Sequence, residues 1–121
     1  MMRIEHITWL SQDAEEALLM IRDNSYSCEV FCQPCTYQTG DTIKNPLISF
    51  EEGNVVKVFD AAISIRKNGE NFSHEVVAKV IDFDKQLVAV GDIMIELSLP
   101  LPKDVKNGEK VLFYPDRLDA M

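Results

Sequence analysis

An alternation of apolar and polar residues, which begins at Tyr26, constrains the fold of this chain more than any other feature. In the first alternating segment Cys28, Val30 and Cys32 fall on one face, and polar side chains fall mostly on the other. Turn residues, mainly glycine, asparagine, aspartate and proline, interrupt the pattern at short intervals. The pattern is typical of a chain of short strands joined by turns.

The Asn68-Gly69 pair is the strongest turn signal in the chain, because this dipeptide is favoured in tight hairpins. It predicts a hairpin between a long strand over residues 55–67 and a partner strand over residues 72–83. The apolar parity changes near Phe59, which indicates a bulge in the first of these strands. A further strand is expected over residues 87–97, with a bend at Gly91.

Residues 11–22 form the one segment with helical spacing. Ser11 or Asp13 could cap a helix here, and Leu18 and Ile21 lie on one apolar stripe. We therefore expect a single N-terminal helix, preceded by a short strand over residues 4–10. Ile4 and Trp9 of that strand are expected to contribute to the core, and residues 116–121 are expected to form one loose turn.

The fold class that follows is mainly β (α+β). We expect one domain over residues 1–121, since this length suffices for one core and no linker or repeat divides the chain. The expected architecture is a small, strongly bent antiparallel sheet or an OB-like barrel of about six strands, with one N-terminal helix. The alternative is a half-open sheet with the helix packed on one face.

Three cysteines, Cys28, Cys32 and Cys35, have the spacing that holds an iron–sulfur cluster in radical-SAM enzymes. If residues 26–33 are extended, Cys28 and Cys32 lie about 13 Å apart and cannot share one cluster or form a disulfide. A chain this short and rich in strands also lacks room for a βα barrel. The sequence therefore predicts no metal ion and no cofactor.

The Cys32–Cys35 pair keeps two alternatives open. A CxxC pair could form half of a zinc site, but no second such pair exists and His6 and His74 lie far away in sequence. It could also be redox-active, although such pairs usually precede a helix, and turn residues follow this one. The simplest interpretation is that the cysteines are buried thiols, with one at the surface.

The sequence contains no recognisable catalytic arrangement. Asp82 and Asp84 share one face of a strand, and Asp92 and Glu96 share one face of the next, so either pair could act as an acid–base dyad. Alternating charge is equally typical of a solvated sheet face. No phosphate-binding loop occurs, and we expect a protein that is not an enzyme.

The formal net charge of −8, with a pI near 4.6, argues against a nucleic-acid ligand, because lysine and arginine are scattered among acids. No apolar stretch approaches the roughly 20 residues that a membrane span needs, and the N-terminus lacks the shape of a signal peptide. We expect a cytoplasmic protein with no membrane association.

Charge and the absence of catalytic motifs favour a non-enzymatic acidic module that binds a partner protein, for which a basic protein is a candidate. An inhibitor or immunity-type protein that masks a basic toxin fits this description. The expected contact residues are acidic or aromatic: Glu29, Phe31, Glu51, Glu52, Asp82, Asp84 and Glu96. The alternatives are a small β-barrel that binds a ligand, a thiol or metal protein that uses Cys32 and Cys35, and a homodimer that pairs edge strands near Pro34 or Pro46.

Overall fold

The computed structural model describes residues 1–69 and 71–120, which contain twelve β-strands and no helix. The strands are β1 (Met2–Ser11), β2 (Glu16–Arg22), β3 (Ser27–Cys32), β4 (Thr42–Ile43), β5 (Leu47–Phe50), β6 (Val56–Val58), β7 (Ser64–Lys67), β8 (His74–Asp82), β9 (Leu87–Val90), β10 (Ile93–Glu96), β11 (Lys110–Phe113) and β12 (Arg117–Ala120). The prediction of a mainly β chain is confirmed. None of the described residues belongs to a helix with the length and hydrophobicity needed to cross a membrane.

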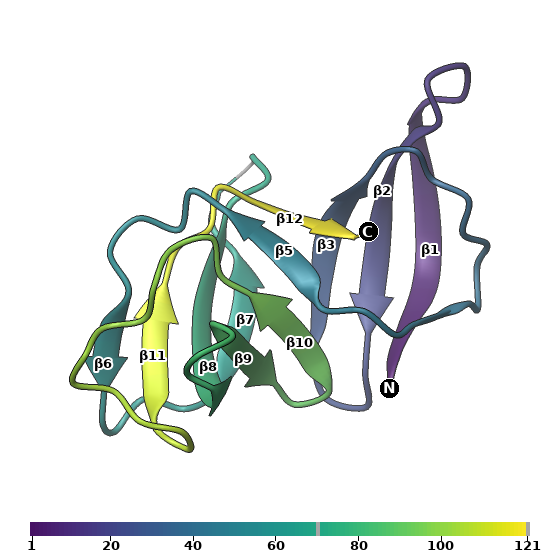
Figure 1. Ribbon diagram of the computed structural model, residues 1–121. Coiled ribbons are helices and arrows are strands. Elements are labelled where there is room, and N and C mark those ends of the chain that lie inside the picture. Colours follow the sequence, from purple (N-terminus) through teal and green to yellow (C-terminus); the bar gives the residue numbers. More distant parts are fainter. Residues whose placement is uncertain (70, 121) are drawn as a thin grey trace.

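The strands form one mixed sheet in the order β4-β1-β2-β3-β12-β5-β10-β9-β8-β11-β6, and β7 also pairs with β8. Two pairs, β3–β12 and β5–β10, are parallel. The sheet bends so that β1–β3 lie on one side and β6–β11 on the other, while β5 and β12 cross between the two groups (Figure 1). β3 and β7 contact each other across the bend. The path ends in β4 and β6, strands of two and three residues. The expected six-stranded antiparallel barrel is therefore wrong, because the sheet is mixed and keeps open edges.

The expected N-terminal helix is also wrong. Residues 11–22 form the turn and second strand of a β1–β2 hairpin that projects from the molecule (Figure 1). Ala17, Leu19 and Ile21 are fully buried at a spacing of two, while Leu18 and Met20 between them are only half-buried. An apolar run of this kind satisfies helical and strand periods alike, and pairing with β1 and β3 on both sides selects the strand.

The later strands are shorter than expected. The segment over residues 87–97 is a hairpin of β9 and β10, joined by Gly91 and Asp92. Gly91 has φ of 60°, and a two-residue hairpin loop requires a positive φ at that position. The segment over residues 55–67 is divided into β6 and β7. The hairpin predicted at Asn68-Gly69 is confirmed as the β7–β8 pair.

Alternation along the strands produces one hydrophobic core on the inner face of the bent sheet. β3 shows the pattern clearly, with Cys28, Val30 and Cys32 buried and their neighbours partly exposed. Ile4 belongs to the core as expected, whereas Trp9 is 40% exposed and does not. The largest fully buried apolar side chains come from strands throughout the chain: Ile4, Leu19, Ile21, Leu47, Ile93, Ile95, Phe113 and Leu118. Burial of each contributes roughly 1.5–3 kcal/mol.

Candidate functional site

The three cysteines are buried free thiols. Cys28 and Cys32 lie on β3, so the prediction of an extended segment is confirmed for Ser27–Cys32. Cys35 follows Pro34 and is buried too, at 4% exposure, so the expectation of one surface thiol is wrong. It contacts the Cys32 thiol, and Cys32 Sγ lies 3.9 Å from the carbonyl oxygen of Pro34.

Burial determines the chemistry of these thiols. It raises the pKa of Cys28 to about 12, and burial together with the Cys35 contact raises the pKa of Cys32 to about 12. Both are therefore protonated at neutral pH, and a protonated thiol is a poor nucleophile and a poor metal ligand. Within residues 1–69 and 71–120, no three His, Cys, Asp or Glu side chains are grouped to hold a metal ion.

His74 is buried at the start of β8, at 1% exposure. Its Nδ1 donates to the carbonyl oxygen of Phe72 at 3.1 Å, because a carbonyl can only accept. Burial lowers the pKa of His74 below its ordinary value. Cys28 and His74 line a small pocket of about 260 Å³ between β3 and β7. A neutral imidazole beside a protonated thiol favours a structural role there. His6 lies exposed on β1.

Glu52 is an acid that lies buried inside the protein, at 1% exposure. Its carboxylate accepts hydrogen bonds from the backbone N–H groups of Ser98 and Leu99 at 2.7 and 3.0 Å, and from the hydroxyls of Ser98 and Ser49 at 2.6 and 3.2 Å. Burial would raise the pKa of Glu52, but these hydrogen bonds outweigh it and the pKa is lowered. Through these hydrogen bonds Glu52 connects β5 to the segment after β10, and its carboxylate is not available for an external contact.

The other carboxylates that suggested acid–base pairs serve different purposes. Asp82 Oδ1 accepts from the backbone N–H groups of Asp84 and Lys85 at 3.1 and 3.2 Å, and so caps the β8–β9 turn. Asp92 pairs with the N-terminal amine of Met1. Glu96 is exposed at the end of β10. The carboxylates of Asp82 and Asp92 are therefore engaged by groups of the protein itself.

Strand register joins several predicted contact residues in one row on the outer face of the sheet. Directly paired positions follow one another across eight strands: Thr8, Leu18, Phe31, Asp119, Ile48, Glu96, Leu87 and Asp82. Paired residues share a face, and none of the eight is buried. Phe31, Glu96 and Asp82, which are far apart in sequence, therefore belong to one surface.

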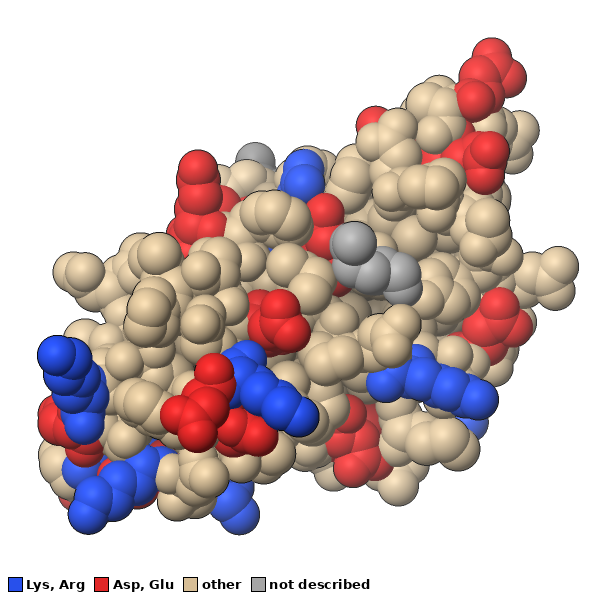
Figure 2. Space-filling view, viewed as in Figure 1, with Lys and Arg blue, Asp and Glu red and all other residues tan. Residues whose placement is uncertain are grey.

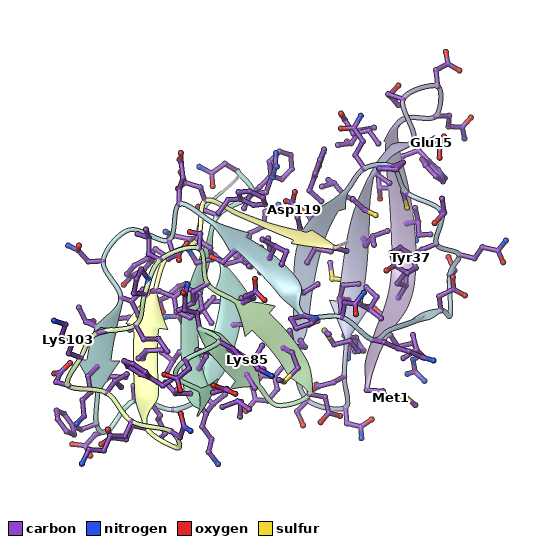
Figure 3. The ribbon with its side chains drawn as sticks, in the orientation of Figure 1. Met1, Glu15, Tyr37, Lys85, Lys103 and Asp119 are labelled. Atoms are coloured by element: carbon purple, nitrogen blue, oxygen red, sulfur yellow. The ribbon has the colours of Figure 1, made fainter. Side chains whose placement is uncertain are left out.

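The centre of this surface is built around Arg117 on β12. Its guanidinium lies 4.4 Å from the centroid of the Phe31 ring and 5.2 Å from that of the Phe50 ring. Arg117 Nε and Nη2 donate to the two carboxylate oxygens of Asp119 at 2.7 and 3.0 Å. Burial raises the pKa of Asp119, although the adjacent guanidinium opposes this. Figure 3 shows Asp119 where β12 crosses between the two groups of strands. The outer-face patch is defined as Phe31, Ile48, Phe50, Glu96, Arg117 and Asp119.

Surface charge is unevenly distributed. In Figure 2 the lysine and arginine side chains gather mainly along the lower edge, whereas the projecting hairpin shows only acidic groups. Glu15 lies at the tip of that hairpin (Figure 3). The upper part of this view is therefore more acidic than the lower part.

The predicted contact residues divide into three groups. Phe31 and Glu96 belong to the outer-face patch. Two further acids lie beside it: Glu29 on β3 and Glu51 directly after β5. Glu29 is paired with Lys67 at 3.0 Å. Asp82 and Asp84 lie at the far end of the row, near the β8–β9 turn, and Glu52 lies inside the protein.

Sequence reasoning missed Arg117 and Phe50. Arg117, Leu118 and Asp119 do alternate, which is the signal that could have revealed β12.

Comparisons with protein-family models, with curated protein sequences and with solved structures each gave no match.

Proposed function

We propose that this protein is a non-enzymatic acidic module that binds a basic partner protein through the outer-face patch. The observation that carries the proposal is the row of paired residues, because it brings Phe31 and Glu96 to one surface with Arg117 and Phe50. Aromatic residues, phenylalanine included, and arginine are enriched at protein interfaces, and arginine is among the residues that most often dominate the binding energy. An inhibitor or immunity-type protein that masks a basic toxin is the form of this function that we favour.

Electrostatics supports a basic partner. The chain carries a formal net charge of −8, and the one arginine in the patch is already paired with Asp119. Complementary charge would accelerate the encounter and make it sensitive to salt. The aromatic rings would then supply the short-range contacts.

The test is affinity capture with the full chain, followed by measurement on the purified partner. We expect a captured protein of basic pI, bound at least about tenfold more weakly by Phe31→Ser than by the wild type. Trp9→Ser is the matched control, since Trp9 is also exposed. Trp9 pairs with the buried Ala17, so the two residues share the inner face of the sheet, opposite the outer-face patch. Capture of only acidic or neutral proteins, or equal weakening by both variants, would refute the proposal.

A further inference from the structure

A pocket of about 360 Å³ opens at one end of the outer-face patch. It is lined by Phe50, Glu51, Phe72, Asp116 and Arg117. The two phenylalanine rings are 39% and 40% exposed, so they form apolar walls that are open to solvent. The lining residues come from the end of β5, the β7–β8 connection and the start of β12, three segments that meet only in the folded chain.

The charge of this pocket is negative. Glu51 and Asp116 are exposed, and no lysine or arginine among the described residues forms an ion pair with either of them. Arg117 is the one base in the lining, and both carboxylate oxygens of Asp119 neutralise it. An entering group would therefore meet two carboxylates without counter-ions, next to two phenyl rings.

The protein already holds one guanidinium in this kind of environment. Arg117 stacks between Phe31 and Phe50, and a carboxylate binds the edge of its guanidinium. Arginine is suited to such a site because its planar group stacks on aromatic rings and its fork of N–H donors matches carboxylates. The pocket offers the same two elements, rings and carboxylates, and its own arginine, Arg117, is already bound by Asp119 rather than by Glu51 or Asp116.

We propose that this pocket receives an arginine side chain of the basic partner. The identity of the occupant rests on the proposed function, whereas the affinity of the pocket for a guanidinium can be tested without any partner. A phosphate or other anion would be repelled by Glu51 and Asp116. An ammonium is a compact, strongly hydrated charge and would exploit the rings less well than a guanidinium does.

The experiment is an NMR titration of the isotope-labelled full chain with three capped tripeptides of the form Gly-X-Gly. X is arginine, lysine or citrulline, which keeps the shape of arginine but carries no charge. We expect the arginine peptide to shift the backbone amide signals of Phe50, Glu51, Phe72 and Asp116, with an affinity in the millimolar range. The lysine peptide should bind more weakly and the citrulline peptide should cause no shift.

Variants locate the site. Glu51→Gln and Asp116→Asn should each weaken the arginine peptide about two- to fivefold, as expected for one exposed ion pair. Phe72→Leu should weaken it by a similar factor, because it removes a ring face. Asp13→Asn is the charge-matched control, since it removes one exposed acid from the β1–β2 turn, outside both the pocket and the outer-face patch, and it should leave the affinity unchanged.

The inference would be overturned by equal shifts with the citrulline peptide, or by shifts that Glu51→Gln and Asp13→Asn reduce equally. Binding of the lysine peptide as tightly as the arginine peptide would refute the assignment to a guanidinium. Failure of the proposed function looks different. In that case the arginine peptide would still bind in the pocket, but no basic protein would be captured.

Discussion

Glu51 and Glu52 are consecutive acids with opposite environments, and they show how the two faces of this sheet differ. Glu52 lies inside, where four hydrogen bonds occupy its carboxylate and connect β5 to residues 98 and 99. Glu51 lies outside, beside the exposed ring of Phe50 and at the edge of the pocket. Glu52 therefore stabilises the fold whereas Glu51 remains exposed to solvent, although the two acids are adjacent in the chain.

The largest effect is expected inside. Glu52→Ala should lower the free energy of unfolding by about 3–5 kcal/mol, because it leaves buried donors of Ser98, Leu99 and Ser49 without a partner. Glu51→Ala is the neighbouring control and should change it by less than about 0.5 kcal/mol. Urea denaturation measures both, and similar losses in the two variants would abolish the contrast between the faces.

A smaller loss is expected where the turn between β2 and β3 meets the turn between β9 and β10. Asp23 accepts backbone hydrogen bonds from Ser25, Tyr26 and Asp92, and a Cβ atom at Gly91 would lie 2.5 Å from Asp23 Oδ2. Gly91→Ala should lower the free energy of unfolding by about 2–4 kcal/mol, from this clash and from the positive φ.

Gly108→Ala separates the two causes of that loss. Gly108 also has a positive φ, of 90°, but no heavy atom lies within 4 Å of the position that its Cβ would take. This variant should therefore lose only the backbone component, about 1–2 kcal/mol. If Gly108→Ala lost as much stability as Gly91→Ala, the contact with Asp23 would have no energetic role.

Low pH is expected to lower the stability of the protein by an intermediate amount. The pKa values of Glu52 and Asp23 are lowered from their ordinary values of 4.5 and 3.8, so the unfolded chain takes up protons more readily at these sites. The stability that they contribute is present above those ordinary values and is lost as the pH falls through the folded-state pKa values. Stability of the wild type should decline below about pH 5. Glu52→Gln should show a shallower decline, and an unchanged slope would contradict the role assigned to Glu52.

The smallest effect on stability is expected at the outer-face patch. Phe50→Ser should change the free energy of unfolding by less than about 1 kcal/mol, since the ring is 39% exposed. The same variant should lower the affinity for the partner by at least about tenfold. Denaturation and calorimetric titration of one protein preparation compare the two quantities. A large loss of stability without a loss of affinity would reverse the assignment of the two faces.

The parts of the fold that depend on local pattern could be predicted from the sequence. Alternation at Cys28, Val30 and Cys32 gave a strand with the correct inward face, and Asn68-Gly69 gave the correct hairpin. The helix over residues 11–22 failed because an unbroken apolar run fits both periods. The two parallel strand pairs were not predicted, for another reason. They join Phe31 to Asp119 and Leu47 to Ile95, and no short-range signal records such pairing.

The candidate site follows the same division. Phe31 was expected on the polar side of its strand, and it lies there. Glu51 and Glu52 could not be separated, because a positive φ of 52° at Glu51 breaks the alternation and turns Glu52 inward. Of the loose turn expected over residues 116–121, residue 121 lies outside the described residues, and Arg117–Ala120 form β12. The patch around Arg117 was therefore invisible until that strand was placed.

The position of β12 also bears on how the molecule is made. Residues 117–120 lie in the middle of the sheet, between β3 and β5, although they follow the other strands of the described residues in the chain. A nascent chain that has not reached Arg117 lacks the strand that joins the first three strands to the rest, so it exposes two strand edges to solvent or to a chaperone. Completion of this sheet must therefore wait until residues 117–120 have been synthesised.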